Sequence, residues 1–198
     1  MILLANIHPR RSIRLKGYDY AQAGAYFVTI CTQGRACLLG DVVDGDIRLN
    51  DAGRMIESVW NDLPTFYPGV ATDEFVVMPN HVHGIIVIVG AAPQRLVGAA
   101  PRGRPDSDDR PYSGQPQGVA PTLSLPDVVH RFKTMTTKRY ANGVKQSGWS
   151  PFAGRLWQRN YYEHIIRDGQ DLDSIREYIV NNPLQWALDQ ENPLNARP

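Results

Sequence analysis

The clearest strand pattern in the chain lies in Phe75-Val-Val-Met-Pro-Asn-His-Val-His-Gly-Ile-Ile-Val-Ile-Val89. Its apolar runs at 75–78 and 81–89 are strand-sized and rich in β-branched residues. Between them, Pro79-Asn80 is a turn signal. The pattern therefore predicts two neighbouring strands joined by a tight turn.

Elements before this pair can be placed in the same way. The run 26–31 predicts a first strand, and a short strand pair is expected near 36–39 and 46–49. Asn50 is expected to cap an amphipathic helix that lasts until Pro64.

After residue 122, helical spacing of apolar residues predicts a helix capped by Ser124 or Asp127 and running through Tyr140. A long strand is expected at 156–166. A final helix is expected to begin at Asp171 or Asp173 and to stop at Pro183. This order predicts an α+β domain with a mainly antiparallel sheet covered by helices.

The chain of 198 residues suits a single domain, 1–198. Six of its fifteen prolines fall between Gly90 and Thr122, and a Val-Gly-Ala-Ala-Pro segment begins at Val89 and again at Val97. We expect residues 90–122 to be a flexible, low-complexity insertion. No apolar run approaches the roughly 18 residues of a membrane span, and no signal-peptide core is present, so a cytoplasmic protein is expected.

The net charge of +1 does not by itself indicate a nucleic-acid partner, but basic residues gather in two blocks around an acidic segment at 41–74. Two such blocks could line one groove for an anionic polymer, whereas most charge clusters are only solvated surfaces. The candidate DNA-binding residues are Arg10, Arg11, Arg14, Lys16, Arg131, Lys133, Lys138 and Arg139.

Two histidines begin the strand predicted at 81–89. Side chains two residues apart on a strand project from one face, so His81 and His83 can chelate one metal ion. A pair of buried histidines satisfied by hydrogen bonds would give the same pattern.

The final helix adds a second pair. Tyr178 and Asn182 are four residues apart and therefore lie on one helix face, at the edge of the stripe formed by Ile175 and Ile179. An amide oxygen is an acceptable ligand for a hard divalent cation. Spacing alone favours Tyr178 as a packing aromatic and Asn182 as a helix-terminal residue.

Three segments resemble the REP-associated tyrosine transposases, which belong to the HUH single-strand nucleases. They are Met78-Pro-Asn-His-Val-His-Gly-Ile-Ile86, Leu156-Trp-Gln-Arg-Asn-Tyr-Tyr-Glu-His-Ile-Ile-Arg167 and Ile175-Arg-Glu-Tyr-Ile-Val-Asn-Asn-Pro183, in the order found in that family. The resemblance runs from about Arg14 to Trp186, apart from the insertion. It implies a ferredoxin-like HUH nuclease domain.

The resemblance also implies roles for individual residues. Tyr178 becomes the nucleophile that forms a covalent phosphotyrosine, and His81, His83 and Asn182 become ligands of Mg²⁺ or Mn²⁺. The expected substrate is single-stranded DNA with hairpin-forming repeats, which the enzyme would cut and rejoin. A monomer is favoured over a homodimer.

Two other functions remain open at this point. His164 and His130 could join His81 and His83 in a zinc site, giving a hydrolase that uses metal-bound water. Alternatively, the chain could be a DNA-binding protein on the same fold without catalytic activity. Tyr161 and Tyr162 are weaker candidates for the nucleophile than Tyr178, since unpaired bases commonly stack on such aromatics.

Overall fold

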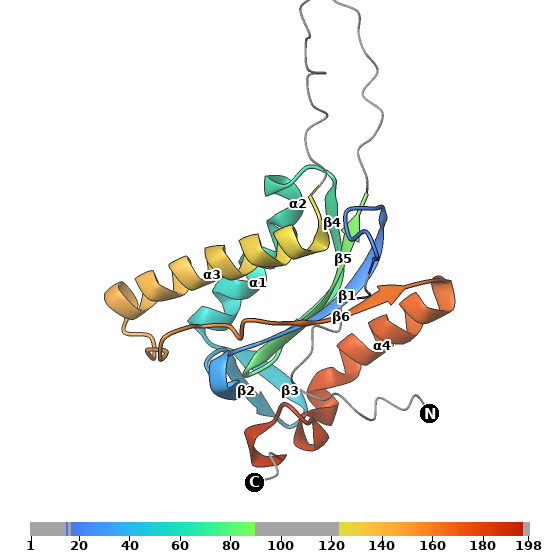
Figure 1. The fold of residues 1–198 in the computed structure, drawn as a ribbon. Helices are drawn as coiled ribbons and strands as arrows, with labels where there is room; N and C mark the ends of the chain where they lie inside the picture. Colours follow the sequence, from blue (N-terminus) through green and yellow to red (C-terminus); the bar gives the residue numbers. More distant parts are fainter. Residues whose placement is uncertain (1–14, 16, 90–122, 196–198) are drawn as a thin grey trace, which may run out of the picture.

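A computed structural model describes residue 15, residues 17–89 and residues 123–195. Its centre is a four-stranded sheet with helices on both faces (Figure 1). The strands are β1 (Gly24–Cys31), β4 (Val70–Val77), β5 (His81–Ile88) and β6 (Tyr162–Ile166). The expected insertion at 90–122 lies outside the described residues.

The sheet has the spatial order β4-β5-β1-β6, and each neighbouring pair is antiparallel. Helix α1 links β1 to β4, and α3 links β5 to β6. This connectivity is the split βαβ arrangement of ferredoxin-like domains. The expected α+β fold with a helix-covered antiparallel sheet is therefore confirmed, with a small hairpin of β2 (Gly40–Val43) and β3 (Asp46–Leu49) added beside it.

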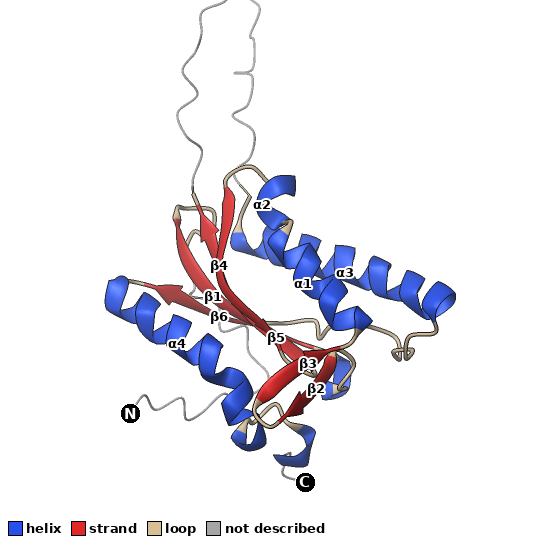
Figure 2. Cartoon of the chain, turned by 180° about the vertical axis from the view of Figure 1, so that it is seen from behind, coloured by secondary structure: helices blue, strands red, loops and turns tan. Residues whose placement is uncertain are grey.

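One face of the sheet is covered by α1 (Asp51–Asn61), α2 (Leu63–Phe66) and α3 (Leu125–Ser147), as both views show (Figure 2). The larger apolar cluster lies there and includes Trp60, Phe132, Tyr140 and Trp157. The Asn50 cap of α1 is confirmed, because its side chain accepts a hydrogen bond from Gly53 N–H. Ser124 caps α3 in a capping box with Asp127.

The opposite face is covered by α4 (Gly169–Gln185). In the part of the chain that the structure describes, Phe27, Ile85 and Ile179 form the buried centre of its apolar contact with the sheet. Two short 3₁₀ helices, η2 (Trp186–Leu188) and η3 (Pro193–Asn195), follow α4 and return toward the end of the sheet where β5 begins. A third, η1 (Gln33–Arg35), follows β1.

The prediction of a long strand at 156–166 was wrong, because β6 begins only at Tyr162. The Lys133 ammonium donates hydrogen bonds to three consecutive carbonyls, those of Gln158, Arg159 and Asn160. These carbonyls are turned toward a lysine rather than toward a neighbouring strand. Trp157 keeps only an isolated bridge to Thr32.

Other expected boundaries were also displaced. Pro183 does not stop α4, which continues to Gln185 and begins at Gly169 after an Asp168 cap. Helix α3 passes Tyr140 and ends at Ser147, where Gly148 takes a left-handed conformation. The short strand expected at 36–39 lies instead at Gly40–Val43.

No helix in the described ranges is long and apolar enough to cross a membrane.

Candidate metal and tyrosine site

Strand alternation decides which side chains of β5 face α4. Val82 and Ile86 belong to the large cluster under α1 and α3, while Ile85 packs under α4. His81 and His83 therefore share the α4 face and are almost completely buried, at 0% and 3% exposed. Gly84 lies on the other face against Trp60 and Phe75, where a Cβ atom would collide with both rings. The glycine after the histidine pair thus lets Trp60 pack tightly behind the site.

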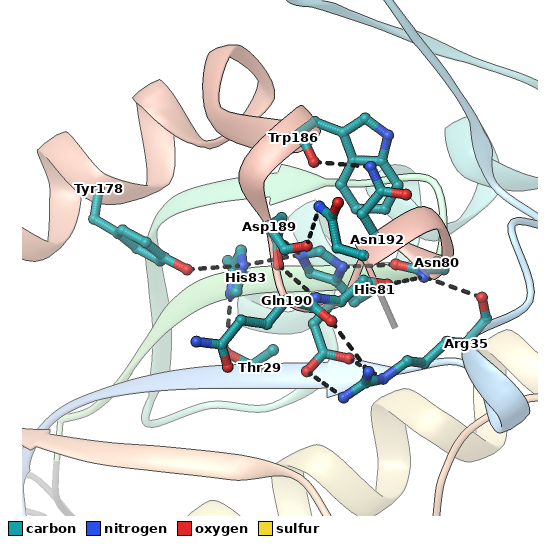
Figure 3. A network of polar contacts seen from close by, with 12 residues as sticks. Thr29, Arg35, Asn80, His81, His83, Tyr178, Trp186, Asp189, Gln190 and Asn192 are labelled. Carbon is teal, nitrogen blue, oxygen red and sulfur yellow. Dashed lines mark hydrogen bonds and ion pairs between the residues drawn. The ribbon is translucent and has the colours of Figure 1, made fainter. Parts of the chain in front are cut away.

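The two histidines point their Nε2 atoms at each other, 2.9 Å apart (Figure 3). Two nitrogens bound to one ion at about 2.1 Å each and at a right angle would be separated by roughly 3.0 Å. The observed spacing therefore suits two ligands of a single metal ion.

Asn80 fixes the protonation of His81. The Asn80 amide nitrogen donates to the carbonyls of Arg35, at 3.0 Å, and Glu191, at 2.6 Å. Its oxygen must then be the atom that lies 2.8 Å from His81 Nδ1, and a carboxamide oxygen can only accept. His81 therefore carries its proton on Nδ1 and presents a lone pair on Nε2.

Thr29 is the corresponding partner of His83. Its hydroxyl lies 2.9 Å from His83 Nδ1, and the two residues are directly opposite in the β1–β5 register. A hydroxyl can donate or accept, so His83 can take either tautomer. With its proton on Nδ1, His83 presents a second lone pair toward His81, and two facing lone pairs at this distance repel unless a cation lies between them.

The histidines are electrically neutral at ordinary pH. Burial lowers the pKa of His83 to about 3. Burial, and then the charges of His83 and Arg35, also lower the pKa of His81 well below its usual value. Neutral imidazoles are the form that binds metals.

Tyr178 reaches the pair from α4. Its hydroxyl lies 3.5 Å from His83 Nε2, and its ring meets the Phe27 ring edge-on at 5.9 Å between centroids. Burial, and then the Asp189 carboxylate, raise the pKa of Tyr178 to about 12. The phenol is therefore held neutral next to the histidines when no cation is present.

Asn182 also faces the site, one turn after Tyr178 on α4. It is 2% exposed, and its side-chain oxygen has no hydrogen-bond partner among the described residues. A buried acceptor without a donor is costly. A cation bound by the histidines could satisfy this oxygen.

The sequence reasoning missed Asp189, which follows η2. Its Oδ2 lies 3.8 Å from His81 Nε2, and one ligand atom from each of His81, His83 and Asp189 fits within 4.8 Å of the others. Burial is the main cause that raises the pKa of the Asp189 carboxyl. No sequence spacing connects Asp189 to the strand, because a turn of the chain after α4 brings it there.

The two histidines that could have joined His81 and His83 in a zinc site lie elsewhere. His164 lies on β6, with Nε2 2.9 Å from Asp171 Oδ2, and His130 is exposed on α3 across the sheet. Within the described ranges, the metal-capable group that contains the histidine pair is completed by Asp189. Neither His164 nor His130 joins it.

The structure places the second basic block on α3, on the sheet face opposite the histidines. Arg131 lies 4.7 Å from the Tyr67 ring centroid, and Lys133 is engaged by carbonyls. Lys138 is exposed and Arg139 half-buried. The first block, Arg10, Arg11, Arg14 and Lys16, lies outside the described residues, so the predicted groove stays a prediction.

Comparison with known proteins gives two relatives from Haemophilus influenzae. A protein of unassigned function is 39% identical over 94% of each chain. Another, named "Putative REP-associated tyrosine transposase", is 24% identical over 84% of this chain and 74% of its own. A solved REP-associated tyrosine transposase bound to a REP hairpin has 19% identity and a TM-score of 0.43, covering 91% of this chain and 73% of its own. No protein-family model matches.

The second relative is thus similar to this chain over most of its length and carries the name of the family that the three sequence segments resemble.

Proposed function

We propose that the protein is a divalent-metal-dependent transesterase that cuts and rejoins single-stranded DNA, with Tyr178 as the nucleophile. The observation that carries this proposal is the convergence of three groups on one point. The Nε2 atoms of His81 and His83 lie 2.9 Å apart, and the Tyr178 hydroxyl lies 3.5 Å from the second of them. The family resemblance supports hairpin-forming repeats as the substrate.

The donor set suits a divalent cation. His81 and His83 would hold it, Asn182 would contribute its unpartnered oxygen, and Asp189 is near enough to contribute a carboxylate. A bound Mg²⁺ or Mn²⁺ would polarise the scissile phosphate and neutralise its developing charge. Imidazole ligands favour manganese over magnesium in affinity.

The protein's own groups perform the remaining work. Thr29 and Asn80 fix the ring orientation of the histidines through their Nδ1 atoms. Helix α4 delivers the Tyr178 oxygen to the phosphorus, where a Tyr–O–P bond forms as the phenol gives up its proton and one P–O bond of the DNA breaks. The leaving oxygen takes up a proton and becomes a free hydroxyl. One phosphoester replaces another, so rejoining needs no nucleotide cofactor.

All of these residues come from one chain, which supports a monomer as the active form. A homodimer is not required to assemble the site.

The group of His81, His83 and Asp189 also favours a second candidate function. Two histidines and one carboxylate are a common ligand set of catalytic zinc, which activates a water molecule for hydrolysis. In that case the DNA would be cleaved without a covalent protein intermediate.

The deciding experiment is incubation of the protein with labelled hairpin single strands, with and without Mn²⁺, followed by denaturing electrophoresis and peptide mapping. We expect a metal-dependent covalent adduct on Tyr178. The Tyr178→Phe variant should bind DNA and Mn²⁺ normally and form no adduct, while the matched Tyr162→Phe variant should still form one. An adduct on Tyr161 or Tyr162 would move the nucleophile, and hydrolysis without any adduct would favour the zinc function.

A further inference from the structure

The helix that carries Tyr178 has little apolar support. Among the described residues beneath α4, Phe27, Ile85 and Ile179 are buried, and the eight other apolar residues packed against them are partly buried. Close packing normally fixes how a helix is rotated and placed on a sheet. With a cluster of this size, polar contacts between α4 and the sheet contribute to the position of Tyr178 relative to the histidines.

One such contact lies on the first edge strand. The Arg176 guanidinium donates two hydrogen bonds to the Asp73 carboxylate on β4, with Nε 3.1 Å from Oδ1 and Nη2 2.5 Å from Oδ2. Asp73 lies where the β4–β5 register shifts between Thr72 and Phe75. Irregular strand positions of this kind redirect a side chain. Arg176 is two residues before Tyr178.

The other contact lies on the opposite edge strand. The Asp171 carboxylate oxygens are 2.9 Å and 3.1 Å from His164 Nε2 on β6, and one also accepts from the Arg167 N–H. Because the sheet order is β4-β5-β1-β6, the two pairs connect α4 to both edges of the sheet. Between them the helix crosses β5 and β1, where His83 and Thr29 lie.

We propose that the Arg176–Asp73 and Asp171–His164 pairs form a two-sided clamp that holds α4 in the register that brings the Tyr178 hydroxyl to His83. This proposal rests on the proposed function and adds four positioning residues to it, none of which touches the reacting atoms. Asp171 and Arg176 are five residues apart, which corresponds to about 7.5 Å along a helix. Contacts at both edges of the sheet resist rotation of the helix about its axis as well as sideways swinging.

The clamp has an unusual expected signature. Half-exposed ion pairs contribute little to global stability, whereas a displacement of about 1 Å between reacting groups can slow a reaction by roughly 100-fold. Loss of one pair should therefore reduce the rate of chemistry far more than it reduces stability, metal affinity or DNA affinity.

The test uses Arg176→Gln in the full chain, with hairpin single-stranded DNA and Mn²⁺. We expect adduct formation at saturating DNA to slow by about 10- to 100-fold, with the half-saturating DNA concentration and Mn²⁺ affinity unchanged. Without metal, amide hydrogen exchange in α4 should become faster while exchange in α3 stays the same. The charge-reversed double variant Asp73→Arg with Arg176→Asp should recover much of the rate.

Asp173→Asn is the matched control. Asp173 also pairs with Arg176, at 3.2 Å, but lies within the same helix and does not reach the sheet. It should react at the wild-type rate. If wild type forms an adduct and Arg176→Gln forms it equally fast, the clamp is refuted. If wild type forms no adduct, the proposed function itself fails, whereas faster α4 exchange in Arg176→Gln would still support the clamp.

Discussion

The two faces of the sheet differ in what they bury. Under α1 and α3 lies a broad apolar cluster built around aromatic rings, with Trp60 stacked on Phe75 at 4.3 Å and edge-on to Phe132 at 5.5 Å. Under α4 the apolar contact is small, and the same face buries His81, His83 and Asn182. One face therefore provides most of the folding stability, while the other uses that stability to hold polar groups out of water.

The largest effect on stability is expected when an aromatic ring is removed from the apolar face. Phe132→Ala should destabilise the protein by about 3–5 kcal/mol, because Phe132 is completely buried and its loss leaves a cavity. Tyr178→Phe on the α4 face should change stability by less than about 1 kcal/mol. Urea denaturation of both variants measures the contrast, and equal losses would show that the two faces share the stabilising role.

Acidic pH should lower the stability of the protein chiefly through the histidines buried on the α4 face. The unfolded chain protonates His81 and His83 near the ordinary histidine pKa of about 6.5, whereas burial keeps them neutral in the folded state, with the pKa of His83 near 3. The unfolded state thus binds more protons below pH 6.5. Stability should fall by a few kcal/mol as the pH drops from about 6.5 toward 3.

Metal-free protein allows this acid effect to be measured by denaturation at several pH values. The double variant His81→Gln with His83→Gln should show a flatter pH dependence between pH 3 and 6.5. An unchanged slope would assign the acid sensitivity to other groups.

Removing a proposed ligand should have the next largest effect. His81→Ala and His83→Ala should each weaken Mn²⁺ binding by at least about 100-fold, which calorimetric titration can measure. In wild type, Mn²⁺ at about 100 times its Kd should raise the free energy of unfolding by roughly 2.7 kcal/mol, and this increase should disappear in both variants. Full Mn²⁺ affinity in either variant would contradict the assignment. The Mn²⁺ affinities of Asn182→Ala and Asp189→Asn would show which of the two oxygens is the better ligand.

The hydroxyl that orients His83 should matter less than the metal ligands themselves. Thr29→Val preserves shape but removes the group that orients His83, so Mn²⁺ affinity should fall by about 10- to 100-fold. Thr134→Val is a suitable control, since its hydroxyl donates only to a carbonyl of its own helix, α3. Equal affinities of wild type and Thr29→Val would mean that the packing around His83 is enough to orient it.

The smallest effect is expected from two basic residues on α3, the exposed Lys138 and the half-buried Arg139. Replacing Lys138 and Arg139 by glutamine should lower the slope of log DNA affinity against log salt by about 1.4 for single strands, if both contact phosphates. The slope can be measured by fluorescence anisotropy. An unchanged slope would place the DNA on the α4 side alone and sharpen the division between the two faces.

Local rules allowed part of this protein to be predicted from its sequence. Alternation along a strand put His81 and His83 on one face of that strand, and helical spacing put Tyr178 and Asn182 on one face of the last helix. Each rule depends only on neighbours along the chain. Capping by Asn50 and Ser124 was predictable for the same reason. The α+β class followed from the order of the elements.

Only the tertiary structure decided what these faces meet. The 3.5 Å approach of Tyr178 to His83, the arrival of Asp189 beside His81 and the anchoring of Asn80 by the Arg35 and Glu191 carbonyls join residues far apart in the chain. Lys133 likewise drew the carbonyls of residues 158–160 away from a strand ladder. Such contacts form because buried polar groups must find partners in the folded chain, and sequence spacing does not specify which partners lie within reach.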